Sequence, residues 1–361
     1  MNSFVNITDV CSEIFAGGDA PKSNMSESKT DAYRIPIFSN GEANDGLYGY
    51  TNFARVTQPS ITVSARGTIG FVAIRNEPFV PIVRLISLTP DPEKIEIRYL
   101  YYAIQNYKFD GSGTSIPQLT VPMLKKYSFP LPTKEQQLAI IDQLDNVCNL
   151  ISLRKQQLAK LDELVKSRFI ELFGDGHDGK TPVKMLGSIC KFQQGTQIPV
   201  EEQIEEQLAG FKRFLRIVDY TQAPQPPRYV NVNGKEVDEK SVVIVRYGAT
   251  AGFVGRGYRG VLANNLFEII PNETLLSKDF LFLALKYGTF EKDVHDKAFG
   301  AAMPALSFSM MNDISVVVPT EELQRQFVTF VEQTDKSKFE IQKSLEKLET
   351  LKKALMQKYF G

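Results

Sequence analysis

The second half of this chain repeats the first half, and this repeat limits the possible folds more than any other feature of the sequence. Residues 116–174 align without a gap on residues 303–361, and the shared letters include Pro132-Thr133 with Pro319-Thr320, Gln137 with Gln324, and Phe173-Gly174 with Phe360-Gly361. A repeat of this length indicates a duplicated domain rather than a solenoid unit. The sequence therefore predicts two halves, each a globular part followed by a long helix, related by a pseudo-twofold axis.

Both repeats end in a stretch whose apolar residues are spaced by three and four, which is typical of a long helix that pairs with another helix. The predicted helices span 133–174 and 320–361, each about 60 Å long at about 1.5 Å per residue. We expect Thr133 and Gln136 to form a capping box and Gly174 to end the first helix. The two helices are predicted to pair through Leu144, Val147, Ile151, Leu158, Leu161 and Val165 of the first and Val331, Ile341, Leu345, Leu348 and Leu355 of the second. A coiled-coil arm for dimerisation is the alternative interpretation.

The globular parts, residues 1–132 and 175–319, are predicted to be diverged copies of one small α+β domain. Short β-branched segments alternate with Gly and Pro turns, and helices are predicted over 98–107 and 278–287. In each part a β-branched run is followed by an arginine, a glycine-bearing turn and the letters Gly-Phe-Val. This order predicts a strand, a tight turn and a second strand.

The composition excludes some classes of protein and leaves others open. Lys plus Arg and Asp plus Glu both number 42, so a surface that binds nucleic acid must be a local patch. Three cysteines, Cys11, Cys148 and Cys190, form no CxxC pair, and the sequence shows neither a signal peptide nor a long apolar run. These features predict a soluble protein of a reducing compartment.

One string has the letters of a phosphate-binding loop. Residues 174–181 match GxxxxGK[ST], but such a loop needs a buried strand before it and a helix after it. Here a predicted long helix precedes the string and Pro182 follows it. The context therefore favours a linker.

A second string has the letters of a metal-dependent nuclease. Asp219, Asp238 and Lys240 supply two carboxylates and a lysine, but they occur in one half of the chain and Asp238 lies in a polar stretch that predicts a solvated turn. The two histidines, His177 and His295, lack partners at the spacing of zinc ligands. We therefore expect neither a metal site nor an active site in this chain.

Taken together, these features resemble the HsdS-type specificity subunit of type I restriction-modification systems. The resemblance covers essentially the whole chain and rests on two copies of a P-[LV]-P-x-x-E-Q-like motif, LPTKEQ at 131–136 and VPTEEL at 318–323, each leading into a long helix that ends in Phe-Gly. The second copy has Leu323 in place of Gln136. The resemblance implies an α+β fold of two similar target-recognition domains separated by two long antiparallel coiled-coil helices.

The function implied by this resemblance is that of a DNA reader without catalytic activity of its own. Each domain would read one half of an interrupted, asymmetric site in double-stranded DNA. The helices would fix the gap and dock methyltransferase subunits, two per chain, and restriction subunits would join that complex. S-adenosylmethionine, ATP and Mg²⁺ would then bind only to the partner subunits, in the cytoplasm of a bacterial or archaeal cell.

The resemblance also implies which loops face the DNA. Arginine can reach a guanine edge or a phosphate, and glycine allows the backbone to approach closely. The candidates are Arg66, Gly67, Thr68 and Gly70 in the first half, Arg246, Tyr247, Gly248 and Thr250 in the second half, and the loops that contain Ser112, Thr114, Ser115 and Gly300. Each segment is otherwise a plain hairpin or connecting loop.

Two functions from other classes stay open at this point. A coiled-coil adaptor that binds only proteins would show no salt-dependent binding to duplex DNA, whereas a DNA reader must show it. A nuclease that uses Asp219, Asp238 and Lys240 would cleave DNA with Mg²⁺ when purified alone.

Overall fold

The computed structural model divides into two compact units that share both long helices. The structure describes residues 3–107, 118–174, 180–221, 225–298 and 305–361. Unit 1 contains Met1–Lys155 and Lys343–Gly361, and unit 2 contains Gln156–Gln342. Helix α4 (Lys134–Phe173) begins in unit 1 and ends in unit 2, whereas helix α10 (Glu321–Phe360) begins in unit 2 and ends in unit 1.

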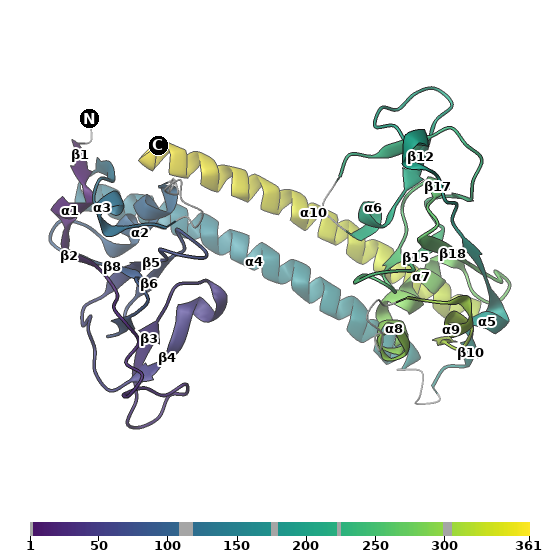
Figure 1. Cartoon of the computed structure of the whole chain (residues 1–361), viewed down its shortest axis with the longest axis horizontal. Coiled ribbons are helices and arrows are strands. Elements are labelled where there is room, and N and C mark those ends of the chain that lie inside the picture. The colour runs from purple at the N-terminus through teal and green to yellow at the C-terminus, as the bar shows by residue number, and fades with distance from the viewer. Residues whose placement is uncertain (1–2, 108–117, 175–179, 222–224, 299–304) are drawn as a thin grey trace. The chain divides into compact units, whose positions relative to one another are not determined.

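Unit 1 is an α+β domain (Figure 1). Its strands are β1 (Ser3–Asn6), β2 (Cys11–Ala16), β3 (Ile35–Phe38), β4 (Leu47–Thr51), β5 (Ser60–Val63), β6 (Val72–Arg75), β7 (Val80–Pro81), β8 (Ile86–Pro90) and β9 (Ser128–Leu131). Its short helices are α1 (Ile7–Val10), α2 (Ile97–Asn106), α3 (Val121–Leu124) and a 3-10 turn at Ala43–Gly46. The strands form an antiparallel sheet in the order β2-β8-β5-β6, a smaller sheet in the order β4-β3-β7, and the pair β1-β9 that leads into α4.

Unit 2 repeats this arrangement. Its strands are β10 (Val183–Met185), β11 (Cys190–Gln194), β12 (Lys212–Leu215), β13 (Arg228–Val230), β14 (Glu236–Val237), β15 (Val242–Val245), β16 (Val254–Gly255), β17 (Gly260–Leu262), β18 (Leu266–Pro271) and β19 (Ser315–Val317). Its short helices are α5 (Leu186–Ile189), α6 (Ile217–Thr221), α7 (Lys278–Tyr287), α8 (Phe290–Ala298), α9 (Phe308–Asn312) and a 3-10 turn at Val200–Glu202. The sheet β11-β18-β15-β16 matches β2-β8-β5-β6, and β10-β19 matches β1-β9.

The duplication predicted from the sequence is therefore confirmed at the level of topology. The predicted helices over 98–107 and 278–287 are α2 and α7. The predicted strand-turn-strand units are the antiparallel pairs β5-β6 and β15-β16. Among the described residues, strand β14 of the second sheet and helix α8 after α7 occur in unit 2 alone, so the described parts of the copies have diverged in their peripheral elements.

Each main sheet shares one core with short helices and with part of the long helices. In unit 1, Ile61 and Val63 of β5 are buried together with Tyr99 and Leu100 of α2. In unit 2, Phe267 of β18 occupies a corresponding core with residues of α7. Burying a side chain of this size contributes about 1.5–3 kcal/mol, so these cores hold each sheet in place.

Helix α4 has the capping residues that the sequence predicts at both of its ends. The Thr133 N–H donates to Gln136 Oε1 at 3.1 Å, and the Gln136 N–H donates to Thr133 Oγ1 at 3.4 Å, which is the reciprocal pattern of a capping box. At the other end Gly174 has a φ of 74° and its N–H donates to the Ile170 carbonyl at 2.8 Å. A left-handed glycine is the usual way to end a helix, because it has no Cβ to clash.

The long helices pair antiparallel within each unit. In unit 1, Tyr359 of α10 donates to Gln143 of α4 at 2.9 Å, and Lys155 lies 3.4 Å from Glu349, so rising numbers in α4 meet falling numbers in α10. In unit 2 the same order holds, because Lys338 pairs with Asp162 at 2.6 Å and the Phe327 ring lies 5.4 Å from that of Phe173.

The residues of the predicted stripe are buried or half-buried. Leu144, Val147 and Val165 are buried in α4, Val331 and Leu345 are buried in α10, and the remaining stripe residues are half-buried: Ile151, Leu158, Leu161, Ile341, Leu348 and Leu355. Charged residues between them are mostly exposed. Although both helices are long, no helix among the described residues has an apolar stretch long enough to span a bilayer.

The Phe-Gly letters that end both repeats have matching places in the two cores. Phe173 is fully buried in unit 2, where its ring lies 5.1 Å from that of Phe280 in α7. Phe360 is buried in unit 1, where its ring lies 5.1 Å from that of Tyr99 in α2. Each long helix therefore ends inside the core of the unit in which it does not begin.

Candidate nucleic-acid interface

The turn between β5 and β6 of unit 1 presents an arginine at an exposed tip. The turn is closed by hydrogen bonds from the Ser64 N–H to the Phe71 carbonyl and from the Gly70 N–H to the Ser64 carbonyl, both 2.9 Å long. Gly67 has a φ of 69°, a conformation that favours glycine, and Arg66, Gly67 and Thr68 are exposed. Among the described residues, the Arg66 guanidinium makes one hydrogen bond, 3.3 Å long, to Gln118. We call residues 64–71 the arginine turn of unit 1.

The corresponding segment of unit 2, residues 245–253, is the arginine turn of unit 2. The Val245 N–H donates to the Phe253 carbonyl at 3.0 Å, the Gly252 N–H donates to the Val245 carbonyl at 2.9 Å, and Gly248 takes the left-handed conformation of Gly67 with a φ of 85°. This turn is one residue longer, because three residues separate Gly248 from Gly252 whereas two separate Gly67 from Gly70. The backbone hydrogen bonds place Arg246 at the position of Ala65 and Tyr247 at the position of Arg66. Tyr247 and Thr250 are exposed.

The arginines of the two turns differ in their surroundings. Arg246 is half-buried, its Nε donates to the Leu306 carbonyl at 3.2 Å, and its guanidinium lies 4.9 Å from the centre of the Tyr247 ring. Arg66 is exposed and has no aromatic neighbour of this kind among the described residues. The side chain of Arg246 is therefore held in place, whereas that of Arg66 is free to reorient.

The second pair of candidate loops precedes residues that bond to these turns. Ser112, Thr114, Ser115 and Gly300 lie outside the described residues. The residues that follow both loops are nevertheless placed. The Leu119 N–H donates to the Ala65 carbonyl at 3.0 Å, and the Leu306 N–H donates to the Arg246 carbonyl at 2.9 Å. In each unit, therefore, a leucine that follows the candidate segment bonds to the arginine turn of that unit through an equivalent backbone hydrogen bond.

A buried glutamine at the start of each long helix fixes the adjoining short helix. Gln137 accepts a hydrogen bond from the Glu96 N–H at 2.9 Å and donates to the Pro132 carbonyl at 3.0 Å. Gln324 does the same with the Ser277 N–H and the Pro319 carbonyl, both at 3.0 Å. Glu96 and Ser277 are the N-cap residues of α2 and α7.

The alignment of the repeats marked these two glutamines as shared letters but did not reveal their role. A glutamine in the first turn of a helix is commonly solvated, so its burial follows only from the packing of α2 and α7 against the long helices. Gln137 is 1% exposed and Gln324 is 4% exposed. We call them the latch glutamines.

The carboxylate of Asp219 is fully engaged by arginines. It accepts hydrogen bonds from Arg213 Nη2 at 2.9 Å, Arg216 Nε at 3.2 Å and the Arg216 N–H at 2.9 Å. Its side chain is 2% exposed. These bonds hold α6 against β12, which is a structural role.

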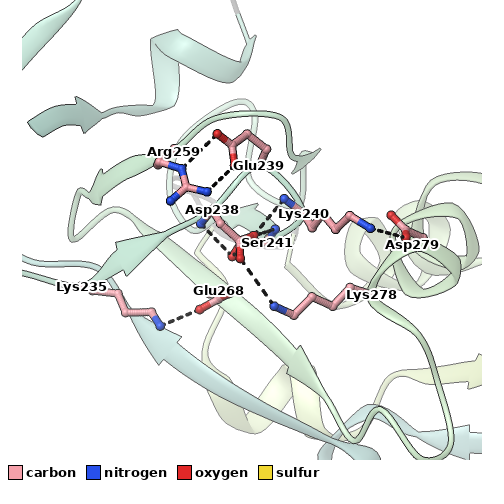
Figure 2. A network of polar contacts seen from close by, with 9 residues as sticks. All are labelled: Lys235, Asp238, Glu239, Lys240, Ser241, Arg259, Glu268, Lys278 and Asp279. Atoms are coloured by element: carbon pink, nitrogen blue, oxygen red, sulfur yellow. Dashed lines mark hydrogen bonds and ion pairs between the residues drawn. The ribbon is translucent and has the colours of Figure 1, made fainter.

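Asp238 and Lys240 also have structural roles, as Figure 2 shows. The Asp238 carboxylate accepts hydrogen bonds from the N–H groups of Lys240 and Ser241, at 2.9 and 2.8 Å, and so closes its own turn. The Lys240 ammonium is directed away from Asp238, toward Asp279 of α7 at 3.4 Å. Burial opposes ionisation of Asp238, but these donors outweigh it and lower its pKa. The arrangement matches the predicted polar turn.

The segment that matches the phosphate-loop pattern does not lie between a strand and a helix, as such a loop requires. Residues 175–179, which include His177, lie outside the described residues, but α4 precedes them and strand β10, not a helix, follows them. His295 lies in α8 with its side chain 70% exposed. Among the described residues no group of three His, Cys, Asp or Glu side chains is placed to hold a metal ion.

Two of the cysteines occupy matching positions and are not poised for nucleophilic chemistry. Cys11 begins β2 and Cys190 begins β11. Burial raises the pKa of both thiols to about 12, so both stay protonated at neutral pH.

The sequence matches the family described as "Type I restriction modification DNA specificity domain" over residues 2–163 and 180–353. A putative type I specificity subunit of Mycoplasma pneumoniae is 34% identical over 168 residues, which cover 44% of this chain and 50% of that protein. The type I restriction enzyme MjaIX specificity subunit of Methanocaldococcus jannaschii is 25% identical over 380 residues, which cover 95% of this chain and 86% of that protein. The matched region thus spans about half the length of the Mycoplasma relative.

Solved structures show the same fold. The type I restriction-modification S subunit from M. genitalium matches with a TM-score of 0.60 and 19% identity, covering 99% of this chain and 96% of that chain. A chain from a structure concerned with complex assembly and conformational transition of the type I system matches with a TM-score of 0.62 and 16% identity, covering 99% and 97%. With the duplicated α+β units and the antiparallel helix pair, the family match over most of the sequence leads to one conclusion: this chain belongs to the type I restriction-modification DNA specificity family.

Proposed function

We propose that this chain is the DNA specificity subunit of a type I restriction-modification complex and reads a bipartite, asymmetric site in double-stranded DNA. Residues 1–132 and 175–319 are the two target-recognition domains, and the helices at 133–174 and 320–361 separate them. The observation that carries the proposal is the repetition of the arginine turn. Two copies of one fold present a glycine-bearing turn after the same inner strand of the main sheet, and each turn carries an arginine within two residues before its left-handed glycine.

The chemistry of the arginine turns suits the reading of DNA. A guanidinium can donate two hydrogen bonds to the O6 and N7 of guanine, and a hydroxyl such as that of Thr68 or Thr250 can bond to a base or a phosphate. A left-handed glycine at the tip leaves room for the backbone to approach. Because the two turns differ in length and in the setting of their arginines, the two half-sites are expected to differ in sequence.

The exposed apolar residues of the long helices support a docking role. Leu150, Leu153 and Leu164 of α4 and Phe339 and Leu351 of α10 are between 44% and 59% exposed, although the helix pair buries a separate stripe. Large apolar side chains that lie outside the helix pair are the kind of surface that a partner protein covers. We assign this surface to methyltransferase subunits, two per chain, with restriction subunits joining the complex.

In this proposal the chain has no catalytic activity alone, and the partners carry the reactions. S-adenosylmethionine, ATP and Mg²⁺ are assigned to the methyltransferase and restriction subunits, which would methylate and cleave the DNA. The roles of Asp219, Asp238 and Lys240 in holding the fold support this division.

The test is to express the chain with a methyltransferase partner and to sequence the methylome of the host. An asymmetric motif in two parts with a fixed gap is expected, and a palindromic motif without a gap would refute the two-reader proposal. Binding of the complex to duplex DNA should weaken as salt rises. Binding without salt dependence would favour a protein adaptor, and Mg²⁺-dependent cleavage by the isolated chain would favour a nuclease.

A second experiment tests the helices as the spacer. Seven residues are inserted after Gln157 of α4 and seven after Gln342 of α10, so that both helices grow together and the heptad register is kept. Seven helical residues add about 10 Å, which corresponds to about three base pairs. The variant is expected to recognise the same half-sites with a longer gap. Changed bases at an unchanged gap would show that the helices do not set the spacing.

A further inference from the structure

The loop between β7 and β8 of unit 1 holds two consecutive residues in a conformation that side chains rarely adopt. Val83 has a φ of 50° and Arg84 has a φ of 64°. A β-branched residue in the left-handed region is strained, and a glycine at this position would avoid that strain. Such strain persists only where the surrounding structure holds it, and it clusters at functional sites.

Three backbone contacts and one side chain hold this loop. The Val83 N–H donates to the Gly18 carbonyl at 2.7 Å, and the Arg84 N–H donates to the Gly17 carbonyl at 2.9 Å. The Leu85 N–H closes the loop onto the Ile82 carbonyl at 3.0 Å.

The side chain is that of Asn40, and it joins the loop to the arginine turn. Asn40 Nδ2 donates to the Val83 carbonyl at 2.6 Å, and Asn40 Oδ1 accepts from the Ala65 N–H at 2.7 Å. Ala65 directly precedes Arg66. A single amide group therefore spans the strained loop and the arginine turn, so their relative placement depends on Asn40.

The strained loop presents a free cation beside the arginine turn. Val83 is 45% exposed, and Arg84 is also exposed. Within the described residues, the Arg84 side chain takes part in no hydrogen bond or ion pair, unlike Arg75, which is buried and bonded to Asp45. An exposed arginine without a partner, on a backbone held in place at a cost in stability, is available to a ligand.

Unit 2 places the equivalent segment in the same position. Between β17 and β18 the residues that correspond to Val83 and Arg84 are Asn264 and Asn265, and the Arg246 N–H donates to the Asn265 carbonyl at 2.9 Å. Among the described residues Asn265 Oδ1 is buried and accepts no hydrogen bond. In both units, therefore, this loop lies against the arginine turn. In unit 1 the side chain of Asn40 joins the two segments, whereas in unit 2 a direct backbone hydrogen bond joins them.

We propose that Arg84 is a specificity-determining residue of the first recognition domain, that it contacts a base edge in the half-site read by that domain, and that Asn40 is its positioning residue. This inference rests on the proposed function. A contact to a phosphate can be made by a long side chain from many positions, so it gives no reason to keep a strained backbone. A base edge must be met at a fixed distance and angle, and a fixed backbone supplies that geometry.

The test uses the complex of the full chain with its methyltransferase partner. The wild-type complex is first shown to bind a bipartite site in a pool of duplexes with every base position randomised; failure at this step contradicts the proposed function itself. Arg84→Ala is then expected to reduce discrimination at one or two positions of one half-site by about tenfold or more, with the other half-site unchanged. Arg34→Ala is the matched control, because it removes an exposed arginine of the same unit that pairs only with Asp31.

Two outcomes of this experiment overturn the inference. If Arg84→Ala weakens binding to all sequences alike and lowers the salt dependence by about one phosphate contact, Arg84 touches the backbone and reads no base. If selectivity stays within twofold of wild type at every position, Arg84 does not contact the DNA.

A second pair of variants tests the role of the backbone. Val83→Gly relieves the left-handed strain, so its melting midpoint should stay the same or rise, while discrimination at the Arg84 positions falls. Asn40→Ala should reduce discrimination at those positions and leave the opposite half-site unchanged. Full discrimination in both variants would show that neither the strain nor Asn40 positions Arg84.

Discussion

The two units keep the same framework and differ in the loops that their frameworks hold. The latch glutamines make equivalent hydrogen bonds in both units, and the terminal phenylalanines of the long helices enter equivalent places in the two cores. The arginine turns, in contrast, differ in length, and Arg246 is held by Leu306 and Tyr247 whereas Arg66 is nearly free. The duplicated fold thus separates residues that hold the structure from residues that are available to a ligand.

A similar pattern of letters in the two halves is therefore not by itself a sign of the same role. Gln137 and Gln324 are shared letters with one structural role, which the matching bonds establish. Arg66 and Arg246 occur in the same pattern of strand, arginine and glycine, yet they occupy neighbouring positions of the turn, and only Arg246 is partly a structural residue.

The largest effect is expected from the phenylalanines. Phe173→Ala removes a fully buried ring between Phe280 and Phe327 and should destabilise the core of unit 2 by about 3–5 kcal/mol. Phe360→Ala should destabilise the core of unit 1 by less, because Phe360 is 6% exposed. Hydrogen exchange measured separately in the two cores checks this prediction. Equal loss of protection in both cores for either variant would contradict the assignment of each ring to one core.

The latch glutamines are expected to have the next largest effect. Gln137→Ala leaves the Glu96 N–H without its partner, and Gln324→Ala does the same to the Ser277 N–H, at about 1–3 kcal/mol for each buried group left unsatisfied. Exchange of the amides at the start of α2 or α7 should report the loss. Gln136→Ala is the control, because this exposed neighbour makes only the capping box and should cost about 1 kcal/mol or less. Similar costs for Gln136 and Gln137 would mean that the latch is unimportant.

Substitutions of the arginines in the two turns should differ in their effects on DNA binding and on protein stability. Arg66→Ala should weaken binding to the cognate duplex by about 1–3 kcal/mol and leave the melting temperature unchanged, since its single protein hydrogen bond is long. Arg246→Ala should weaken binding and also lower the stability of unit 2 by about 1 kcal/mol, because the Leu306 carbonyl loses its donor. Titration of duplex DNA together with thermal melting measures both quantities. If Arg66→Ala is the variant that destabilises, the contrast drawn between the two turns is wrong.

The smallest effect is expected from the ion pairs between the long helices. Burial disfavours the charge of Lys338, but the hydrogen bond and charge of Asp162 outweigh it, so the pKa of Lys338 is raised above 10.5. Stability from a raised lysine pKa is fully present below pH 10.5 and is lost as pH rises through the raised value. Lys338→Met should lower the free energy of unfolding by less than about 1 kcal/mol at pH 7. The variant should also lack the loss of stability that the wild type shows at alkaline pH. Lys155→Met, at the more exposed pair with Glu349, is the control and should change the alkaline melting curve less.

Much of the fold follows from local rules that the sequence states directly. The apolar spacing of three and four defines α4 and α10, and Thr133, Gln136 and Gly174 define the ends of α4 because caps depend on neighbouring residues alone. The arginine turns were placed by their β-branched flanks and glycines, which fix strand, turn and strand over a short span.

The parts of the site that were missed all depend on contacts between distant segments. Asn40 meets Ala65 and Val83 only because β3 and β5 belong to adjoining sheets, and nothing in the letters around Arg84 indicates a left-handed backbone. Two non-glycine residues in that conformation contradict the local preference, so tertiary hydrogen bonds must impose it. The alignment likewise showed that the latch glutamines are shared but not what they do, because their hydrogen bonds join segments that are distant in the sequence.

By itself the sequence determined the duplication, the two long helices, the strand-turn-strand units and the family resemblance, because each of these is a periodic or local pattern that survives divergence. Only the tertiary structure decided which shared residues hold the fold and which are free. Burial, hydrogen-bond partners and backbone strain arise when remote segments pack together, so Arg66 and Arg246 look alike in the sequence and differ in the folded chain.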